Sequence, residues 1–500
     1  MREIYRLTLI VALVAVLTPL ASAFAAPSAA TVTIDPAAID RYVEAQREAA
    51  RIPGLAVGIV RGGKVAYLKG YGVADPSGRG VTAQTPFMLG SVSNSFTALA
   101  VMRLVEAGKV DLDAPVRRYL PWFGMADAAA SDAITIRQLL YHTSGISRSD
   151  GEVAYVDNPN ASIESIVRGM ASLKLDRAIG ESHEYSNLNY DVLGAVVEAV
   201  SGQTFGDYVR GQIFVPLGMT HSYVTLADAQ RGGLATGYRY TFGAVVPTGN
   251  PYSPGNLPSG YLISSAEDMA RYLAMWLGSG PQVVLPAGLD ELRRPGVPAM
   301  PGGYTKYAMG WYSNPDGSVL WHNGSTLNQQ ASVRIMRPGG STPEGIGVVV
   351  LYDINDDALQ AILGQGFPLV DGIISVMYGE RPPSVGNPVQ GLFIADLVGL
   401  VALVMLGYGA ARAWRSRGLP PPVGGHVFVS VTVTTLALFV SLGILLGVSR
   451  AVSWWVVLAT MPDYGYLTLF FCLGLFALTI ARVALLFGQL SGYKLGKARK

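Results

Sequence analysis

Cysteine and charge are both scarce in this sequence of 500 residues. Cys472 is the single cysteine, which excludes an internal disulfide framework and any cysteine-rich metal site. Charged residues make up 14% of the chain, well below the roughly 25% of an ordinary soluble domain. The net charge of +2 offers no basic surface for nucleic acid. Apolar residues make up 50% of the chain, and this excess predicts that part of the protein lies in lipid.

The N-terminus has the features of a signal peptide. Arg2 and Arg6 precede an uncharged run from Leu7 to Ala26, and small residues around Ala23 offer cleavage sites. We predict a signal peptide over residues 1–26, with an uncleaved anchor helix as the alternative. Export predicts that the rest of the protein acts on the periplasmic, extracytoplasmic side of a bacterial inner membrane.

Hydrophobicity becomes continuous near the C-terminus, after a proline-rich linker at residues 381–391. We predict a membrane domain over residues 392–500, because three uncharged segments there are long enough to cross about 30 Å of hydrocarbon as helices. Basic residues follow the first segment and end the chain, which predicts a multi-pass topology with the N-terminal body outside. Inner-membrane lipid is then a partner, and the oligomeric state stays open. The three predicted transmembrane helices cover about 392–411, 427–448 and 464–486.

The stretch between these ends, residues 27–380, is predicted to carry the chemistry. Strand-like runs occur near both of its ends, and helical patterns lie between them. We therefore predict an α/β (α+β) fold, in which both chain ends form one antiparallel sheet and a helical region is inserted between them. The strand-like runs cover 55–60, 65–68, 318–321, 331–336 and 346–352, and the clearest helical patterns cover 95–107 and 190–200.

Three short stretches carry polar residues at the ends of these elements. Ser91 lies where a loop turns into a helix, so it either caps that helix or presents a nucleophile beside unpaired backbone N–H groups. Tyr185 precedes a second helix, and His322 follows a strand and precedes Gly324, which allows close backbone approach. Taken singly, each stretch also fits a purely structural role. The histidines show no metal-ligand spacing, so we predict no metal site and no cofactor.

In this order, the three stretches resemble the motifs of the class C β-lactamase-like serine hydrolases, within the β-lactamase and penicillin-binding-protein superfamily. The stretches Leu139–Ile146 and Ile213–Met219 strengthen the resemblance, which covers about residues 35–370. It implies a β-lactamase/transpeptidase-like fold and the activities of D,D-peptidases, esterases or D-amino-acid peptidases. The layout of signal peptide, hydrolase domain and three spans also resembles the membrane-bound periplasmic prodrug-activating peptidases.

The resemblance implies a role for each matching position. Ser91 is the nucleophile that forms an acyl-enzyme, and Tyr185 relays protons. The backbone N–H groups of Ser91 and Ser325 form the oxyanion hole. His322 occupies the first position of the Lys-Thr-Gly triplet of β-lactamases, and histidine there is typical of the peptidase and esterase members.

A second set of positions is expected to bind a small-molecule or peptide substrate. Asn187 is implied to hold the substrate amide, and Gly324 lets the substrate approach the backbone. Asn189 and Asn328 are further candidates, although an amide in a surface loop is the simpler interpretation of each.

One position departs from the family pattern. The resemblance implies a lysine three residues after the nucleophile, where this chain has Asn94. An amine there shares a helix face with Ser91, accepts its proton and lowers the pKa of Tyr185, and an amide does neither. Three interpretations stay open: a natural pseudoenzyme, an engineered substitution, or activity sustained by another group such as Tyr185 with His322. Our leading hypothesis is a membrane-anchored serine hydrolase impaired by Asn94, and the alternative is a silent peptidoglycan- or peptide-binding protein.

Overall fold

A seven-stranded antiparallel sheet is the centre of the protein. The computed structural model describes residues 32–157, 160–339, 342–355, 368–383, 388–415, 435–436, 438–439, 463 and 465–480. The strands lie in the order β2-β1-β11-β10-β9-β8-β7, so the two ends of the domain meet in one sheet, as predicted. They are β1 (Gly54–Arg61), β2 (Lys64–Gly72), β7 (Lys306–Tyr307), β8 (Tyr312–Ser313), β9 (Val319–Ser325), β10 (Gln330–Met336) and β11 (Ile346–Tyr352).

The sequence pattern explains why the sheet is covered on both faces. β1 and β2 form the predicted hairpin, whose turn places Gly62 and Gly63 at φ values of 56° and 74° that suit glycine. Every residue of β11 is buried. Val349 points to one hydrophobic core and Val350 to the other, because neighbouring side chains in a strand lie on opposite faces.

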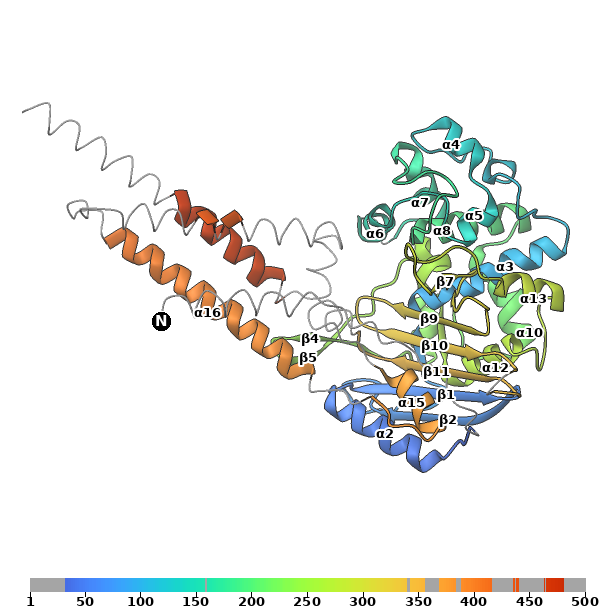
Figure 1. The fold of residues 1–500 in the computed structure, drawn as a ribbon, viewed down its shortest axis with the longest axis horizontal. Helices are drawn as coiled ribbons and strands as arrows, with labels where there is room; N and C mark the ends of the chain where they lie inside the picture. Colours follow the sequence, from blue (N-terminus) through green and yellow to red (C-terminus); the bar gives the residue numbers. More distant parts are fainter. Residues whose placement is uncertain are drawn as a thin grey trace, which may run out of the picture.

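Helices form a layer on each face of the sheet (Figure 1). On one side, α2 (Pro36–Ala49) and α15 (Leu369–Met377) pack against each other and bury the smaller core. On the other side, α12 (Ala266–Trp276) lies against β1 and β11 and belongs to the larger core. The inserted helical region continues beyond this layer, which confirms the predicted arrangement.

Two helices of the inserted region start at the motifs found in the sequence. These are α3 (Ser93–Glu106) and α8 (Asn187–Ser201), which pack against each other. The other helices are α4 (Ala128–Ala133), α5 (Ile136–Leu140), α6 (Arg148–Asp157), α7 (Ile163–Gly169), α9 (Phe205–Val209), α10 (Val215–Leu217), α11 (Leu226–Arg231) and α13 (Pro286–Arg293). Two short two-stranded sheets pair β3 (Pro86–Met88) with β6 (Ile263–Ser265) and β4 (Gly237–Thr241) with β5 (Ala244–Thr248).

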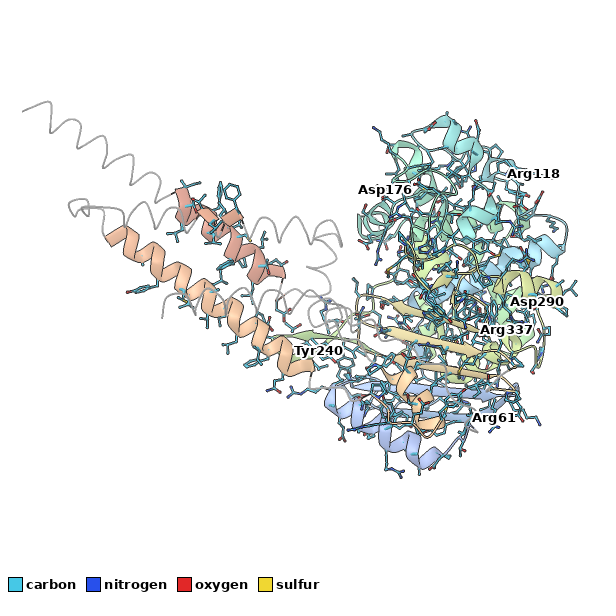
Figure 2. The ribbon with its side chains drawn as sticks, viewed as in Figure 1. Arg61, Arg118, Asp176, Tyr240, Asp290 and Arg337 are labelled. Atoms are coloured by element: carbon cyan, nitrogen blue, oxygen red, sulfur yellow. The ribbon has the colours of Figure 1, made fainter. Side chains whose placement is uncertain are left out.

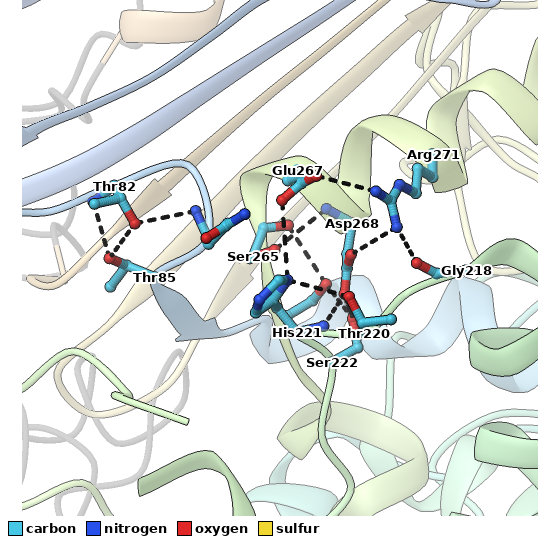
Figure 3. A network of polar contacts seen from close by, with 12 residues as sticks. Thr82, Thr85, Gly218, Thr220, His221, Ser222, Ser265, Glu267, Asp268 and Arg271 are labelled. Carbon is cyan, nitrogen blue, oxygen red and sulfur yellow. Dashed lines mark hydrogen bonds and ion pairs between the residues drawn. The ribbon is translucent and has the colours of Figure 1, made fainter. Parts of the chain in front are cut away.

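A polar network fixes the start of α12 (Figure 3). Asp268 is fully buried, and its carboxylate accepts hydrogen bonds from the backbone N–H of His221 at 2.6 Å and from Ser222 Oγ at 2.8 Å. Ser265 caps the helix by accepting from the N–H of Asp268. Arg271, one turn further on, pairs with Glu267 at 3.0 Å. The network holds α12, and with it one face of the sheet, against the loop that follows α10.

The C-terminal part reaches the body through the β4–β5 hairpin. Figure 2 shows Tyr240 on this hairpin, and its hydroxyl donates to the carbonyl of Ala50 at 2.5 Å. At the hairpin tip, the N–H of Phe242 donates to Asp463 Oδ2 at 2.6 Å. α16 (Pro388–Arg415) begins beside this contact and runs away from the sheet (Figure 1).

The prediction of three transmembrane helices is wrong for the part of the chain that the structure describes. No helix there is both long enough and apolar enough to cross a membrane. α16, which covers the segment predicted at 392–411, includes the buried acid Asp396 and ends with Arg415. Of the third predicted segment, at 464–486, the structure describes residues 465–480, which are helical. The segment predicted at 427–448 lies almost entirely outside the described residues, as do the predicted signal peptide at 1–26 and part of the linker at 381–391.

Candidate active site

Ser91 lies on a short turn that connects β3 to α3. The turn is the 3₁₀ helix Gly90–Val92, and α3 continues directly from it. Two residues just before the turn are fixed by hydrogen bonds to distant segments. The backbone N–H of Met88 donates to Gln329 Oε1 at 2.7 Å, and that of Leu89 donates to the carbonyl of Leu262 at 2.9 Å. Ser91 is partly exposed, whereas its neighbours on the turn are buried. The serine is therefore presented from a fixed backbone at the N-terminus of a helix, where partial positive charge favours a developing anion.

The end of β9 touches this turn, backbone to backbone. A Cβ on Gly324 would lie 2.0 Å from the carbonyl oxygen of Leu89 and 2.7 Å from the backbone nitrogen of Ser91. A Cβ on Gly90 would lie 2.3 Å from the backbone nitrogen of Ser325, and Gly90 has a φ of 53°. Only glycine at both positions allows the contact. Both backbone nitrogens, of Ser91 and of Ser325, therefore lie at the contact between the turn and the end of β9.

Tyr185 meets α3 at Asn94. The Nδ2 of Asn94 donates a hydrogen bond of 2.7 Å to the hydroxyl of Tyr185. Burial raises the pKa of Tyr185, while hydrogen bonds with Ser91 and Asn94 and the charge of Arg148 act to lower it. Ser91, Asn94 and Tyr185 thus form one contiguous group, although they come from distant parts of the sequence.

His322 lies on β9 near this group but is enclosed. Its side chain is 2% exposed, and its ring centre is 6.2 Å from that of Tyr185. Because a carbonyl oxygen only accepts, the 2.6 Å contact with the carbonyl of Asn323 means that Nδ1 carries the proton. Nε2 then accepts from the hydroxyl of Tyr307 at 3.3 Å. Burial lowers the pKa of His322 to about 4, so the ring is neutral at pH 7.

The two other buried histidines beside the site are neutral as well. His142 stacks on Tyr185 with ring centres 4.3 Å apart, and burial lowers its pKa well below 6.5. Its Nδ1 accepts from the Nδ2 of Asn189 at 2.9 Å and from the N–H of Ser186 at 3.2 Å. Burial also lowers the pKa of His183 to about 4. At neutral pH, none of the three histidines supplies positive charge to the site.

The substrate-binding candidates fall into two groups. Asn187 is half-buried at the start of α8, and its Oδ1 has no hydrogen-bond partner in the described part of the chain. Gly324 lies beside Ser91, as described above. By contrast, Asn189 and Asn328 are fully buried, and their amides bind other parts of the protein. Asn189 accepts from Ser144 Oγ at 2.6 Å, and Asn328 donates to the carbonyl of Gly249 at 2.7 Å.

Sequence reasoning missed two residues that build the site. Tyr307 is fully buried and packs against His142, His183, Tyr312 and His322. It lies in a two-residue strand, and no motif surrounds it. Asp191 is buried on α8, where its Oδ2 accepts from Asn256 at 2.9 Å, and burial raises its pKa to about 7. The available signal for Asp191 was an acidic residue flanked by Tyr190 and Val192 in the helical pattern.

Comparisons with known proteins agree with this geometry. Protein flp of Staphylococcus aureus (strain N315) is 28% identical over 382 residues, which cover 76% of this chain and 75% of that protein. The octameric penicillin-binding protein homologue of Pyrococcus abyssi has a TM-score of 0.58 and 28% identity, covering 67% of this chain and 79% of its own. The class C β-lactamase of Rhodobacter sphaeroides, with a TM-score of 0.53 and 24% identity over 64% of this chain and 94% of its own, shares the fold.

The family itself follows from a match along most of the folded body. The family model described as Beta-lactamase matches residues 39–362, a stretch that includes the Ser91 turn, Tyr185 and the end of β9. This range also includes every strand of the seven-stranded sheet. The chain therefore belongs to the beta-lactamase family of serine hydrolases.

Proposed function

We propose that this protein is a serine hydrolase that cleaves an amide or ester in a small-molecule or peptide substrate through an acyl-enzyme on Ser91. The observation that carries the proposal is the close contact of Gly324 with the Ser91 turn, which brings the backbone at the end of β9 next to a partly exposed serine. Ser91 Oγ attacks the carbonyl carbon, and the backbone N–H groups of Ser91 and Ser325 stabilise the oxyanion. Tyr185 relays the proton to the leaving group, and Asn187 holds the substrate amide.

Asn94 limits the rate in this proposal. A general base within reach of the nucleophile is worth roughly 10²–10⁴ in rate, and an amide is no base. Tyr185 does not replace it, because burial raises its pKa above the usual 10 and leaves the phenol protonated at neutral pH. The oxyanion hole still lowers the barrier, so slow acylation is expected to persist.

Covalent labelling tests the proposal. The protein is incubated with a fluorophosphonate or a penicillin-type probe, and its intact mass is followed with time. We expect a slow adduct that is lost in Ser91→Ala and kept in Ser93→Ala, which changes the buried serine at the start of α3. No adduct on the protein or on Asn94→Lys, at any probe concentration, would exclude this function.

A second function is favoured by one specific observation. Asn94 has an amide, which is no base, and burial lowers the pKa values of His142, His183 and His322, so each of these rings is a weak base. A catalytically silent protein that binds peptidoglycan fragments or peptides in the same place would need no strong base. The labelling experiment separates the two functions, because a silent binding protein forms no adduct with the probe.

We also propose that the domain acts on the extracytoplasmic side. The support is the sequence alone, through the basic start and the uncharged run from Leu7 to Ala26. N-terminal sequencing of the protein from fractionated cells tests this location. A mature chain that begins near residue 27 in the extracytoplasmic fraction is expected, and an intact N-terminus in the cytoplasm would contradict it.

A further inference from the structure

Several oxygen atoms around Tyr185 are buried without a hydrogen-bond partner. Asn94 is fully buried, and while its Nδ2 donates to Tyr185, its Oδ1 has no partner among the residues that the structure describes. The same holds for Oδ1 of Asn187 and Oγ of the fully buried Ser186. A buried polar atom without a partner destabilises the folded state, so such atoms call for a ligand that satisfies them.

These atoms belong to one place in the fold. Asn94 is on α3, and Ser186 and Asn187 start α8, which packs against α3. Tyr185 connects the two sides, since it precedes α8 by two residues and its hydroxyl accepts from Asn94. The unsatisfied atoms of Asn94 and Asn187 are amide oxygens, which only accept hydrogen bonds.

The electrostatic surroundings tolerate a cation. The three buried histidines near Tyr185 are neutral at pH 7, as described above. Arg148 is the positive charge that acts on Tyr185, and its Nε pairs with Glu152 at 3.0 Å. Asp191 acts on Tyr185 with the opposite sign. Neither amide oxygen receives a hydrogen bond from an N–H group of the described residues.

We propose that Asn94, Asn187 and Tyr185 form a binding site for a primary amine. This amine acts as the general base for Ser91, a role that the amide of Asn94 cannot fill. A primary amine that has given one proton to the solvent brings two N–H donors and a lone pair, which suits two amide oxygens beside the phenol and leaves the lone pair to accept the proton of Ser91. The amine comes either from the substrate itself, as an amino group on its acyl part, or from a free amine in solution. This inference rests on the proposed function, because it concerns the acylation of Ser91.

The chemistry balances with the amine as the only co-reactant. The neutral amine takes the proton of Ser91 Oγ while Oγ forms a bond to the carbonyl carbon, and the carbonyl π electrons move to the oxygen. The resulting ammonium gives its proton to the leaving nitrogen or oxygen as the bond to that atom breaks. The electron pair of the bond stays with the leaving group, and the amine is regenerated.

The first arm of the test uses a free amine. The rate of Ser91 labelling by a penicillin-type probe is measured on the full chain with methylammonium chloride, at constant ionic strength. We expect the labelling rate to increase at least about tenfold when methylammonium is saturating. This increase is smaller than the full effect of a general base that is fixed in the site. Potassium and tetramethylammonium chloride, which have no N–H donors, should have no effect. Equal stimulation by potassium would overturn the proposal in favour of a salt effect.

The second arm places the amine on the substrate. Hydrolysis of glycine p-nitroanilide is compared with that of glycolic acid p-nitroanilide, in which a hydroxyl replaces the amino group. Faster hydrolysis of the glycine compound by at least about tenfold assigns the site to the substrate's own amine. Stimulation in the first arm alone assigns it to a free amine. No effect in either arm overturns the proposal.

Matched variants separate this inference from the proposed function. Asn94→Lys carries its own amine, so it should label faster than the natural protein and ignore methylammonium. Asn187→Leu removes one amide oxygen. It should raise the half-saturating concentration of methylammonium by at least about fivefold, as expected for the loss of roughly one hydrogen bond. If Asn94→Lys labels quickly and the natural protein ignores both amines, the inference fails while the proposed function stands. If neither protein ever labels, the proposed function fails.

Discussion

Asn94 Nδ2 lies 2.7 Å from the hydroxyl of Tyr185, so the side chain that reaches this tyrosine from α3 is an amide. An amide nitrogen donates a hydrogen bond but accepts no proton at neutral pH. The contact therefore orients the tyrosine without supplying a base.

Restoring the amine should restore the reaction. We expect Asn94→Lys to increase the rate of Ser91 acylation by at least roughly a hundredfold, because a positioned base is worth about 10²–10⁴. The rate is measured by intact mass after exposure to a penicillin-type probe. Asn94→Met is the control, since it has similar length and no base, and it should stay slow. An unchanged rate in Asn94→Lys would mean that this position has another role.

The backbone contact between β9 and the Ser91 turn should not tolerate a methyl group. We expect Gly324→Ala to slow acylation at least about a hundredfold, the cost of losing one oxyanion donor, because its Cβ would lie 2.0 Å from the carbonyl oxygen of Leu89. Urea unfolding should also show a loss of about 1–3 kcal/mol from overpacking. Gly124→Ala, where no atom lies within 4 Å of the new Cβ, is the matched control. Normal labelling in Gly324→Ala would rule out an oxyanion hole at this contact.

Asp191 should make the folded protein less stable as the pH rises. Burial raises its pKa from 3.8 to about 7, so between these values the folded state keeps a proton that the unfolded state has lost. Stability therefore falls with rising pH over this window, by on the order of 1 kcal/mol per pH unit. Asp191→Asn cannot ionise, so its free energy of unfolding relative to the natural protein should increase from pH 4 to pH 7. A constant difference across that range would show that the carboxyl is ionised in the folded state.

His322 should have the opposite pH dependence. Its pKa is lowered to about 4 by burial, from 6.5, so between pH 6.5 and pH 4 the unfolded state binds a proton that the folded state excludes. Its contribution to stability is present above pH 6.5 and is lost as the pH falls toward 4. His322→Gln, which keeps a donor for Asn323 and an acceptor for Tyr307, should lose less stability than the natural protein over that range. Parallel stability curves for the two proteins would contradict the buried, neutral ring.

Local sequence patterns were enough to predict the sheet and the two central helices. The apolar run at 346–352 matches β11, because a strand buried on both faces has no polar residue to mark its sides. The hairpin at 55–68 and the end of α8 followed from glycine turns and helical periodicity in the same way. Local patterns also identified Ser91, Tyr185 and His322 as candidates. Only the family resemblance predicted that these three residues lie close together in the fold.

The remaining features depend on packing that a sequence does not display. Asn189 and Asn328 looked like exposed amides, yet both are buried because their hydrogen bonds go to other segments, at His142 and Gly249. Tyr307 is central to the aromatic group around His322, but its neighbours along the chain form only a two-residue strand. Apolar composition near the C-terminus predicted spans, whereas α16 includes an acid that hydrogen-bonds to Asp463.

The sheet joins the first strands of the domain to the last, and this fixes when the protein becomes able to react during its synthesis. β1 pairs with β11, and the glycine that supports the Ser91 turn lies on β9, more than two hundred residues after the serine. A nascent chain that has passed Ser91 and Tyr185 still lacks the strand that packs against the Ser91 turn. Contacts of such high sequence separation form late. A ribosome arrested before β9 would therefore hold a chain that has the proposed nucleophile but not the proposed oxyanion hole.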